Sequence, residues 1–431
     1  MIKLSQCMIV KNEEKNIEKA LGWAKPVAYE QIVVDTGSTD RTVELAGKMG
    51  AKVYHFDWID DFAAAKNHAI EQATGNWIAF LDADEYFTKE DTTKLIKELE
   101  YIEKNKSSQK KMTVLNMPWV QLDDNGEATG IGEQTRVFRN IKEIRYVGKI
   151  HEQISVYGNI KRIDNISIMH TGYAETEYKE KGKAERNIKM LRAELVRNPN
   201  DLKIKAYLAD SLSSRITLEE NPNAKDMAEV EAVFSEVIEN DGKVPDFLRK
   251  KAFNYLLSRL WSDPEKIAQC EKLCERAYSE YPEDIGFGYY YAATLNKSGK
   301  YAIARDILTK MENPPAVPTR NKTDIPVKTI YGPMEITGQK LLAAQGLGDV
   351  AGIMENAAAL LAADKTQQRI LSPYIHTLLN NNKSYDEVLG ILGDIYNIGS
   401  PNDLLFIARA AKDCGATEFA QLVMVVAKEI M

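Results

Sequence analysis

Strand-like and helix-like segments alternate through the first 175 or so residues, and this alternation limits the fold more than any other feature of the chain. Short apolar runs predict the strands, and segments with helical spacing follow the first four of them. The strands are expected at residues 3–10, 31–35, 52–56, 77–81, 112–122, 135–138 and 163–169. Repeated strand–helix–strand units predict a mostly parallel sheet with helices on both faces, and the last two strands are expected to run antiparallel at a sheet edge.

From about residue 175 the pattern is almost entirely helical. Residues 289–311, YYYAATLNKSGKYAIARDILTKM, have the small residues in mid-helix and the glycine at the turn that are typical of a tetratricopeptide-type unit, although the period along the tail is irregular. We therefore predict an α/β domain at 1–175, a linking helix at 176–200 and an all-α helical-repeat domain at 201–431.

Charge and hydropathy exclude several classes of protein. The chain has 56 Lys and Arg against 63 Asp and Glu, a formal net charge of -7, whereas a general nucleic-acid binder usually shows a basic face. The apolar run at the N-terminus is interrupted by Lys11, Glu13 and Glu14, so it predicts neither a signal peptide nor a transit peptide. No window approaches the roughly 18 apolar residues of a membrane span. We expect a cytoplasmic protein without a transmembrane segment.

Polar turns follow three of the predicted strands. They are KNE at 11–13, DTGS at 35–38 and DAD at 82–84. Ligands of open α/β sheets bind beyond the carboxyl ends of the strands, so these turns are expected to meet at one pocket.

The DAD turn favours a cation site, because two carboxylates at the end of a buried strand are costly unless a cation or a metal ion balances them. Mg²⁺ and Mn²⁺ take such oxygen ligands and usually bridge to phosphates. A solvated acidic turn is the simpler alternative. In the second turn, Ser38 or Thr39 is expected to cap the following helix.

Several motifs resemble those of family 2 glycosyltransferases of the GT-A fold. They are CMIVKNEE at 7–14, VVDTGSTD at 33–40, DFAAAKN at 61–67 and WIAFLDADE at 77–85. With TRVFRN at 135–140, GKIHE at 148–152, HTGY at 170–173 and the helical tail, the chain resembles the bacterial subgroup that includes the sublancin-type peptide S-glycosyltransferases.

The resemblance implies a set of nucleotide-binding residues, in which the segment after the first strand lines the base and ribose. They are Val10, Asn12, Glu13, Asp35, Lys66 and Asp82. Asp35 is expected to bind the imide group of the uracil, and Asp82 is expected to contact the ribose. The family usually has an arginine at the position of Lys66. Lysine offers a point charge in place of the planar guanidinium group of arginine. Asp84 and His170 are the implied ligands of Mg²⁺ or Mn²⁺.

The resemblance also implies an inverting transfer, which needs a general base for the acceptor. Glu152 is the first choice, with His151 beside it and Glu133 as a third candidate. Alternatively, one member of the His151–Glu152 pair orients the other or packs under the sheet. Residues 173–186 are a candidate lid over the donor.

The expected activity is metal-dependent transfer of a hexose or N-acetylhexosamine from a UDP-sugar to a peptide or protein side chain. Helical-repeat surfaces suit extended polypeptides, and the tail is also a candidate homodimer interface. A transferase with a glycan or lipid-linked acceptor and a non-catalytic helical-repeat scaffold remain as alternatives. A Rossmann dehydrogenase is disfavoured because no GxGxxG follows the first strand.

Overall fold

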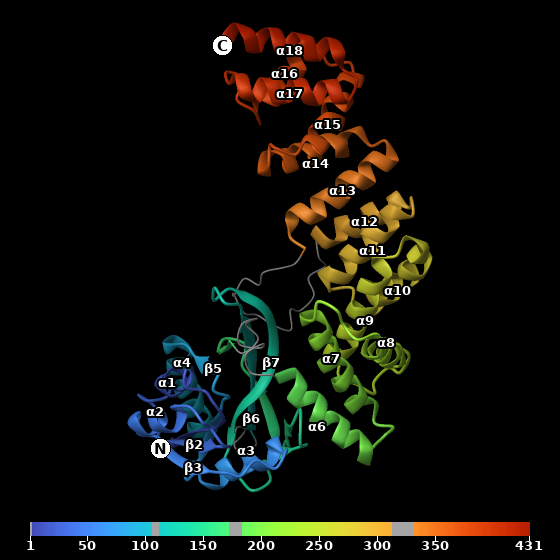
Figure 1. Ribbon diagram of the computed structural model, residues 1–431. Helices are drawn as coiled ribbons and strands as arrows, with labels where there is room; N and C mark the ends of the chain where they lie inside the picture. The colour runs from blue at the N-terminus through green and yellow to red at the C-terminus, as the bar shows by residue number, and fades with distance from the viewer. Residues whose placement is uncertain (1, 106–111, 172–182, 313–330) are drawn as a thin grey trace. The chain divides into compact units, whose positions relative to one another are not determined.

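The computed structural model describes residues 2–105, 112–171, 183–312 and 331–431. Among these residues the chain forms two compact units, one up to residue 233 and one from residue 234 onward. The first unit holds the sheet and its helices, and the second is helical (Figure 1). The division falls inside helix α8, so the next two helices after the sheet, α6 and α7, belong to the first unit. The sequence-based bounds of 175 and 200 stay a prediction.

The first unit alternates strands and helices as far as α4. Its strands are β1 (Leu4–Val10), β2 (Glu30–Asp35), β3 (Lys52–His55), β4 (Trp77–Phe80), β5 (Glu85–Phe87), β6 (Met112–Leu122), β7 (Ala128–Arg139), β8 (Tyr146–Val147), β9 (Gln153–Ile154), β10 (Asn159–Arg162) and β11 (Ile168–His170). Its helices are α1 (Ile17–Gly22), α2 (Thr42–Lys48), α3 (Phe62–Glu71), α4 (Lys89–Lys104), α6 (Lys183–Arg197), α7 (Leu202–Leu218) and the first part of α8 (Ala224–Glu239).

The main sheet has the strand order β3-β2-β1-β4-β7-β6-β11-β5, with β10 paired to β6. Strands β1 to β4 are parallel to one another, and β7 lies antiparallel between β4 and β6. The sheet is therefore mixed, and β7 is an interior strand rather than the expected edge strand. It is also longer than predicted, and the short strands β5, β8, β9 and β10 were not predicted.

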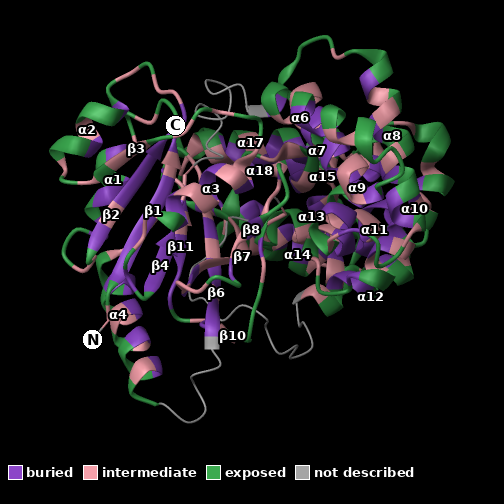
Figure 2. Cartoon of the chain, turned by 90° about the horizontal axis from the view of Figure 1, so that it is seen from below, coloured by how far each residue is buried: buried purple, intermediate pink, exposed green. Residues whose placement is uncertain are grey.

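Alternating side chains of β1 and β4 bury both faces of the sheet. Met8 and Val10 pack with α1, whereas Cys7 and Phe80 pack toward α3. In Figure 2 strands β1, β2 and β4 are buried and the helices around them are exposed on their outer sides. Continuous burial explains why these strands read as apolar runs.

The second unit consists of helices with short connections. They are the rest of α8, α9 (Asp246–Trp261), the short 3₁₀ helix η1 (Pro264–Lys266), α10 (Ile267–Glu280), α11 (Ile285–Lys297), α12 (Tyr301–Glu312), α13 (Pro333–Leu347), α14 (Val350–Ala363), α15 (Gln368–Asn380), α16 (Tyr385–Gly393), α17 (Pro401–Asp413) and α18 (Thr417–Ile430). Aspartate side chains cap several of them, as Asp284 does at α11 and Asp349 at α14. The predicted helical tail is confirmed.

Candidate active site

The carboxyl ends of β1 and β2 lie side by side and bring three of the predicted nucleotide-binding residues together. Val10 is the register partner of Asp35. The buried Asp35 carboxylate accepts backbone N–H bonds from Gly37 and Ser38, each at 3.1 Å. The Asn12 side chain accepts the Thr39 N–H at 2.8 Å, so the turn after β1 is tied to the turn after β2.

The predicted cap of α2 by Ser38 or Thr39 is wrong. The helix begins at Thr42, and the Ser38 hydroxyl instead accepts the N–H of Asn12 at 3.0 Å. The Thr42 hydroxyl accepts the N–H of Glu13 at 2.7 Å. These side chains therefore shape the loop after β1, which holds Asn12 at a left-handed φ of 56°.

A buried lysine connects Asp82 to Glu152. Lys66 lies on α3, and its Nζ is 2.9 Å from Asp82 Oδ1 and 2.8 Å from Glu152 Oε1. Burial alone would lower the pKa of Lys66, but the charges of Asp82 and Glu152 outweigh it and raise the pKa above its ordinary range. Lys66 therefore stays charged. It bonds both Asp82, a predicted nucleotide contact, and Glu152, the predicted general base.

Arg136 on β7 binds the other oxygen of Asp82. Its Nη2 is 2.9 Å from Asp82 Oδ2 and 2.8 Å from Glu85 Oε1, and its Nε is 2.9 Å from Glu85 Oε2. Trp119 Nε1 also donates to Glu85, at 2.8 Å. Burial would raise the pKa of Asp82, but Lys66 and Arg136 outweigh it, so the pKa falls below its ordinary value and the carboxylate is ionised.

Sequence reasoning did not identify Glu85, Trp119 or the role of Arg136. Glu85 directly follows the DAD turn and was assigned to it, yet it begins the short strand β5 and is 1 % exposed. A buried carboxylate of this kind requires a cationic partner. Three carboxylates within residues 82–85 are the signal in the sequence that could have predicted a buried cation nearby.

Asp84 and His170 meet because β11 pairs with β5. His170 is the register partner of Glu85, and its Nε2 lies 3.7 Å from Asp84 Oδ2. The His170 ring packs against Trp119 with centroids 4.3 Å apart. One carboxylate and one imidazole at this separation fit two ligands of one divalent ion whose other positions are filled by phosphate and water. No group of three or more His, Cys, Asp and Glu residues in the described ranges forms a metal cage.

His151 and Glu152 face different neighbours. The His151 ring stacks on Tyr207 of α7, with centroids 3.7 Å apart and planes 9° apart, and its φ is 50°. Glu152 instead bonds Lys66. Glu133, the third candidate, bonds Arg162 at 2.8 Å and Asn116 at 2.6 Å. Among the three, Glu152 is the one placed in the charged cluster around Asp82.

Two further observations concern the surroundings of this site. His55, at the end of β3, lies with its Nδ1 3.4 Å from Asp35 Oδ2. Most of the candidate lid, residues 173–182, lies outside the described residues. Among the described helices, none combines the length and the apolar character needed to cross a bilayer.

Part of the chain matches a known protein family. Residues 5–110 match the family model "Glycosyl transferase family 2". The chain is 34 % identical over 229 residues to a TPR repeat-containing protein of Synechococcus elongatus, a match that covers 51 % of this chain and 53 % of the relative. It is 26 % identical over 309 residues to the SPbeta prophage-derived glycosyltransferase SunS of Bacillus subtilis, covering 67 % of this chain and 65 % of SunS.

The chain thus spans between about half and two thirds of these relatives' lengths. Among solved structures, that of S. aureus TarS 1-349 in complex with UDP-GlcNAc aligns with a TM-score of 0.34 at 16 % identity, covering 65 % of this chain and 90 % of TarS 1-349. The match to residues 5–110 includes β1 to β4 and the DAD turn. Residues 5–110 are therefore similar to family 2 glycosyltransferases, and a helical C-terminal region follows them.

Proposed function

We propose that the first unit transfers a hexosyl or N-acetylhexosaminyl group from a UDP-sugar to a side chain of a peptide or protein, with inversion and with the help of Mg²⁺ or Mn²⁺. One observation carries the proposal: the ionised Asp82 lies between Lys66 and Arg136, next to the Asp84–His170 pair. Buried charges that perturb one another at a strand end are typical of a catalytic site.

Donor binding is assigned to the edge formed by β1, β2 and β4. Val10, Asn12 and Glu13 would line the base and ribose, and Asp35 would accept the uracil imide N–H. Asp82 would bond the ribose, with Lys66 fixing the carboxylate from the α3 side. The carboxylate of Asp35 is already oriented by two backbone N–H groups, which supports this assignment.

Asp84 and His170 would hold the divalent ion against the diphosphate. The ion would supply Lewis-acid stabilisation of the negative charge that develops on the leaving group. The protein contributes the preorganised pair, with the His170 ring set against Trp119 and the Asp84 carbonyl accepting the N–H of Thr171 at 3.0 Å.

Glu152 is the proposed general base. Its Oε1 accepts from Lys66, which leaves Oε2 to take the proton of the acceptor nucleophile. As that proton leaves, the nucleophile forms a bond to the anomeric carbon, the carbon–oxygen bond to the diphosphate breaks, and UDP departs with the electron pair. His151, stacked on Tyr207, would instead position the segment that carries Glu152.

The donor assignment is tested by calorimetric titration of a UDP-sugar panel with Mn²⁺ and then with EDTA. The wild type should bind one donor with metal, and Asp84→Asn should lose at least about tenfold in affinity because it removes a charged ligand. Asp306→Asn, on the exposed face of α12, is the matched control and should bind as the wild type does. Failure of the folded wild type to bind any UDP-sugar with metal present would reject the proposal.

The base assignment is tested by alanine substitution of Glu133, His151 and Glu152, with transfer to acceptor and donor binding measured separately. Glu152→Ala should lower kcat by about 10²–10⁴-fold while UDP binding persists. Near-normal transfer by Glu152→Ala, or an equal loss in Glu133→Ala, would remove Glu152 from this role.

A further inference from the structure

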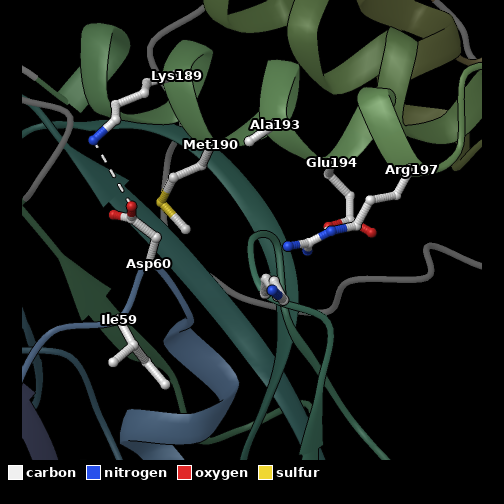
Figure 3. A pocket seen from close by; sticks show the side chains of 8 residues that line it. Ile59, Asp60, Lys189, Met190, Ala193, Glu194 and Arg197 are labelled. Carbon is white, nitrogen blue, oxygen red and sulfur yellow. Dashed lines mark hydrogen bonds and ion pairs between the residues drawn. The ribbon is translucent and has the colours of Figure 1, made fainter.

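A small pocket lies between the loop before α3 and helix α6, within the first compact unit. Its volume is about 200 Å³, enough for a leucine-sized side chain. Figure 3 shows Met190 reaching from α6 toward the loop, with Ile59 on the opposite wall. The lining residues are Ile59, Asp60, Lys149, Lys189, Met190, Ala193, Glu194 and Arg197.

The pocket and the proposed base share one segment of chain. Lys149 lines the pocket and stands three positions before Glu152. Its carbonyl accepts the N–H of Phe62 at 2.8 Å, at the start of the helix that carries Lys66. Arg186 of α6 lies over the Phe62 ring, 5.0 Å from its centroid, so α6 is anchored at the same point. A ligand in this pocket would therefore contact the chain three residues before Glu152, the proposed general base.

The lining combines an apolar centre with charges of both signs. Met190 is buried, whereas Ile59 is 60 % exposed and would lose water contact when a ligand covers it. Asp60 pairs with Lys189 at 3.8 Å (Figure 3). Glu194 pairs with Arg197 at 3.3 Å. Lys149 forms no ion pair with any carboxylate of the described residues, so it is the cation left to meet a ligand.

This composition discriminates between acceptor classes. Asp60 and Glu194 are already paired with Lys189 and Arg197, so a polyanionic chain would find one cation to bind and an apolar centre that its charges do not match. A neutral glycan would leave the exposed Ile59 without an apolar partner. An extended peptide offers both an apolar side chain for the centre and a carboxylate for Lys149. We propose that the pocket is an acceptor subsite for an apolar side chain followed or preceded by Asp or Glu in a polypeptide substrate.

This inference rests on the proposed transferase function and names its acceptor more closely. The probes are fluorescent 12-residue peptides with a central Ser or Cys, a Leu two positions away, and Asp, Ala or Lys next to the Leu. Binding to the full chain, loaded with UDP and Mn²⁺, is measured by fluorescence anisotropy. We expect the Asp peptides to bind the wild type about tenfold more tightly than the Lys peptides, the range of a single charge contact at a partly desolvated site.

Two variants probe the two features of the pocket. Lys149→Glu should reverse the preference between Asp and Lys peptides, and Ala193→Trp should weaken all Leu peptides about tenfold by filling the space. Lys225→Glu, an exposed lysine on α8, is the matched control and should leave the preference unchanged. UDP affinity, measured by calorimetry, should be the same in all four proteins.

The outcomes separate the two proposals. An unchanged peptide preference in Lys149→Glu together with unchanged Leu-peptide binding in Ala193→Trp would overturn the acceptor subsite while the donor site stands. Failure of every peptide to bind a wild type that binds UDP would overturn it as well. Failure of the wild type to bind any UDP-sugar would reject the transferase function, and the subsite with it.

Discussion

Asp82 is bonded by two cations, each through a different carboxylate oxygen. Lys66 takes Oδ1 and Arg136 takes Oδ2, at 2.9 Å in both cases. Arg136 reaches Glu85 as well, with a guanidinium that can bond two carboxylates in fixed directions, whereas Lys66 joins Asp82 to Glu152 as a point charge. The two cations are therefore not interchangeable at this site.

Arg136→Lys is expected to destabilise the protein although it keeps the charge. A lysine at this position loses the forked bond to Glu85, which is 1 % exposed, and the free energy of unfolding should fall by about 2 kcal/mol. Arg192→Lys is the control, because Arg192 also bonds both oxygens of a glutamate, Glu229, but is 48 % exposed. It should change stability by less than about 1 kcal/mol in urea unfolding. Equal losses in both variants would contradict the distinction.

The place of Asp35 at the end of a strand could be predicted from the apolar run before it, whereas Val10 was named from the family resemblance. The two are register partners at the ends of β2 and β1, and their role in nucleotide binding stays a prediction. Glu85 and Trp119 were missed because they meet through β5 and β6, which α4 separates in the sequence and β11 separates in the sheet. A contact between residues this far apart in the sequence produces no hydrophobic periodicity that could predict it.

At the level of elements, Gly75 allows β4 to enter the sheet beside β1. A Cβ at this position would overlap the backbone oxygen of Lys3 and the hydroxyl of Ser5. Gly75→Ala should therefore lower the free energy of unfolding by about 1–3 kcal/mol, since backbone atoms must shift. Gly47→Ala, inside α2 with no atom within 4 Å of the added Cβ, should raise it by about 0.5–1 kcal/mol. Thermal and urea unfolding of both variants would show whether the signs differ as expected.

Glu30 joins the starting ends of several strands. The carboxylate accepts from Ser5 of β1 at 2.7 Å, from Lys52 of β3 at 2.8 Å and from the N–H of Thr74, just before β4, at 2.6 Å. Burial would raise the pKa of Glu30, but these donors outweigh it and lower the pKa to about 2.

The lowered pKa of Glu30 makes a defined contribution to stability against pH. The contribution is complete above the unfolded pKa of about 4.5 and is lost as the pH falls toward the folded pKa of about 2. Glu30→Gln should therefore cost on the order of 2 kcal/mol at pH 6 and progressively less toward pH 2.5 in urea unfolding. Glu44, whose pKa is also about 2 but whose side chain is 48 % exposed, is the control, and Glu44→Gln should cost little at any pH because water screens its partners. A constant difference for Glu30→Gln across this range would refute the assignment.

The elements themselves were largely predictable, and the exceptions have a physical reason. Strands β1, β2 and β4 are buried on both faces and are predicted by their continuous apolar runs. The short strands β8 and β9 form a separate two-stranded sheet, and β10 is mostly exposed, so burial imposes no pattern on their few residues. β7 was found only in its buried last part, because its earlier residues are partly exposed.

At the scale of the whole molecule, the chain forms two compact units. We therefore expect a ligand that binds the first unit to stabilise that unit more than the second. With UDP and Mn²⁺ at about 100 times the dissociation constant, binding adds about 2.7 kcal/mol to the folded state. In differential scanning calorimetry we expect one transition to rise by roughly 5–10 °C and a second to stay within about 1 °C. The shift should vanish in Asp84→Asn. An equal rise of the entire heat-capacity profile would instead mean that the units unfold together.

The stacking of His151 on Tyr207 has a consequence for how such chains can be recombined. Through this contact, and through Lys203 Nζ at 3.4 Å from Gln153 Oε1, helix α7 supports the segment that carries Glu152. A chimaera that grafts the first unit onto a foreign helical array must therefore be spliced after α7, near residue 219, and not at the end of the sheet. Spliced at residue 175, the graft would keep the sheet edge proposed to bind the nucleotide and would lose the contacts that support Glu152, the proposed base.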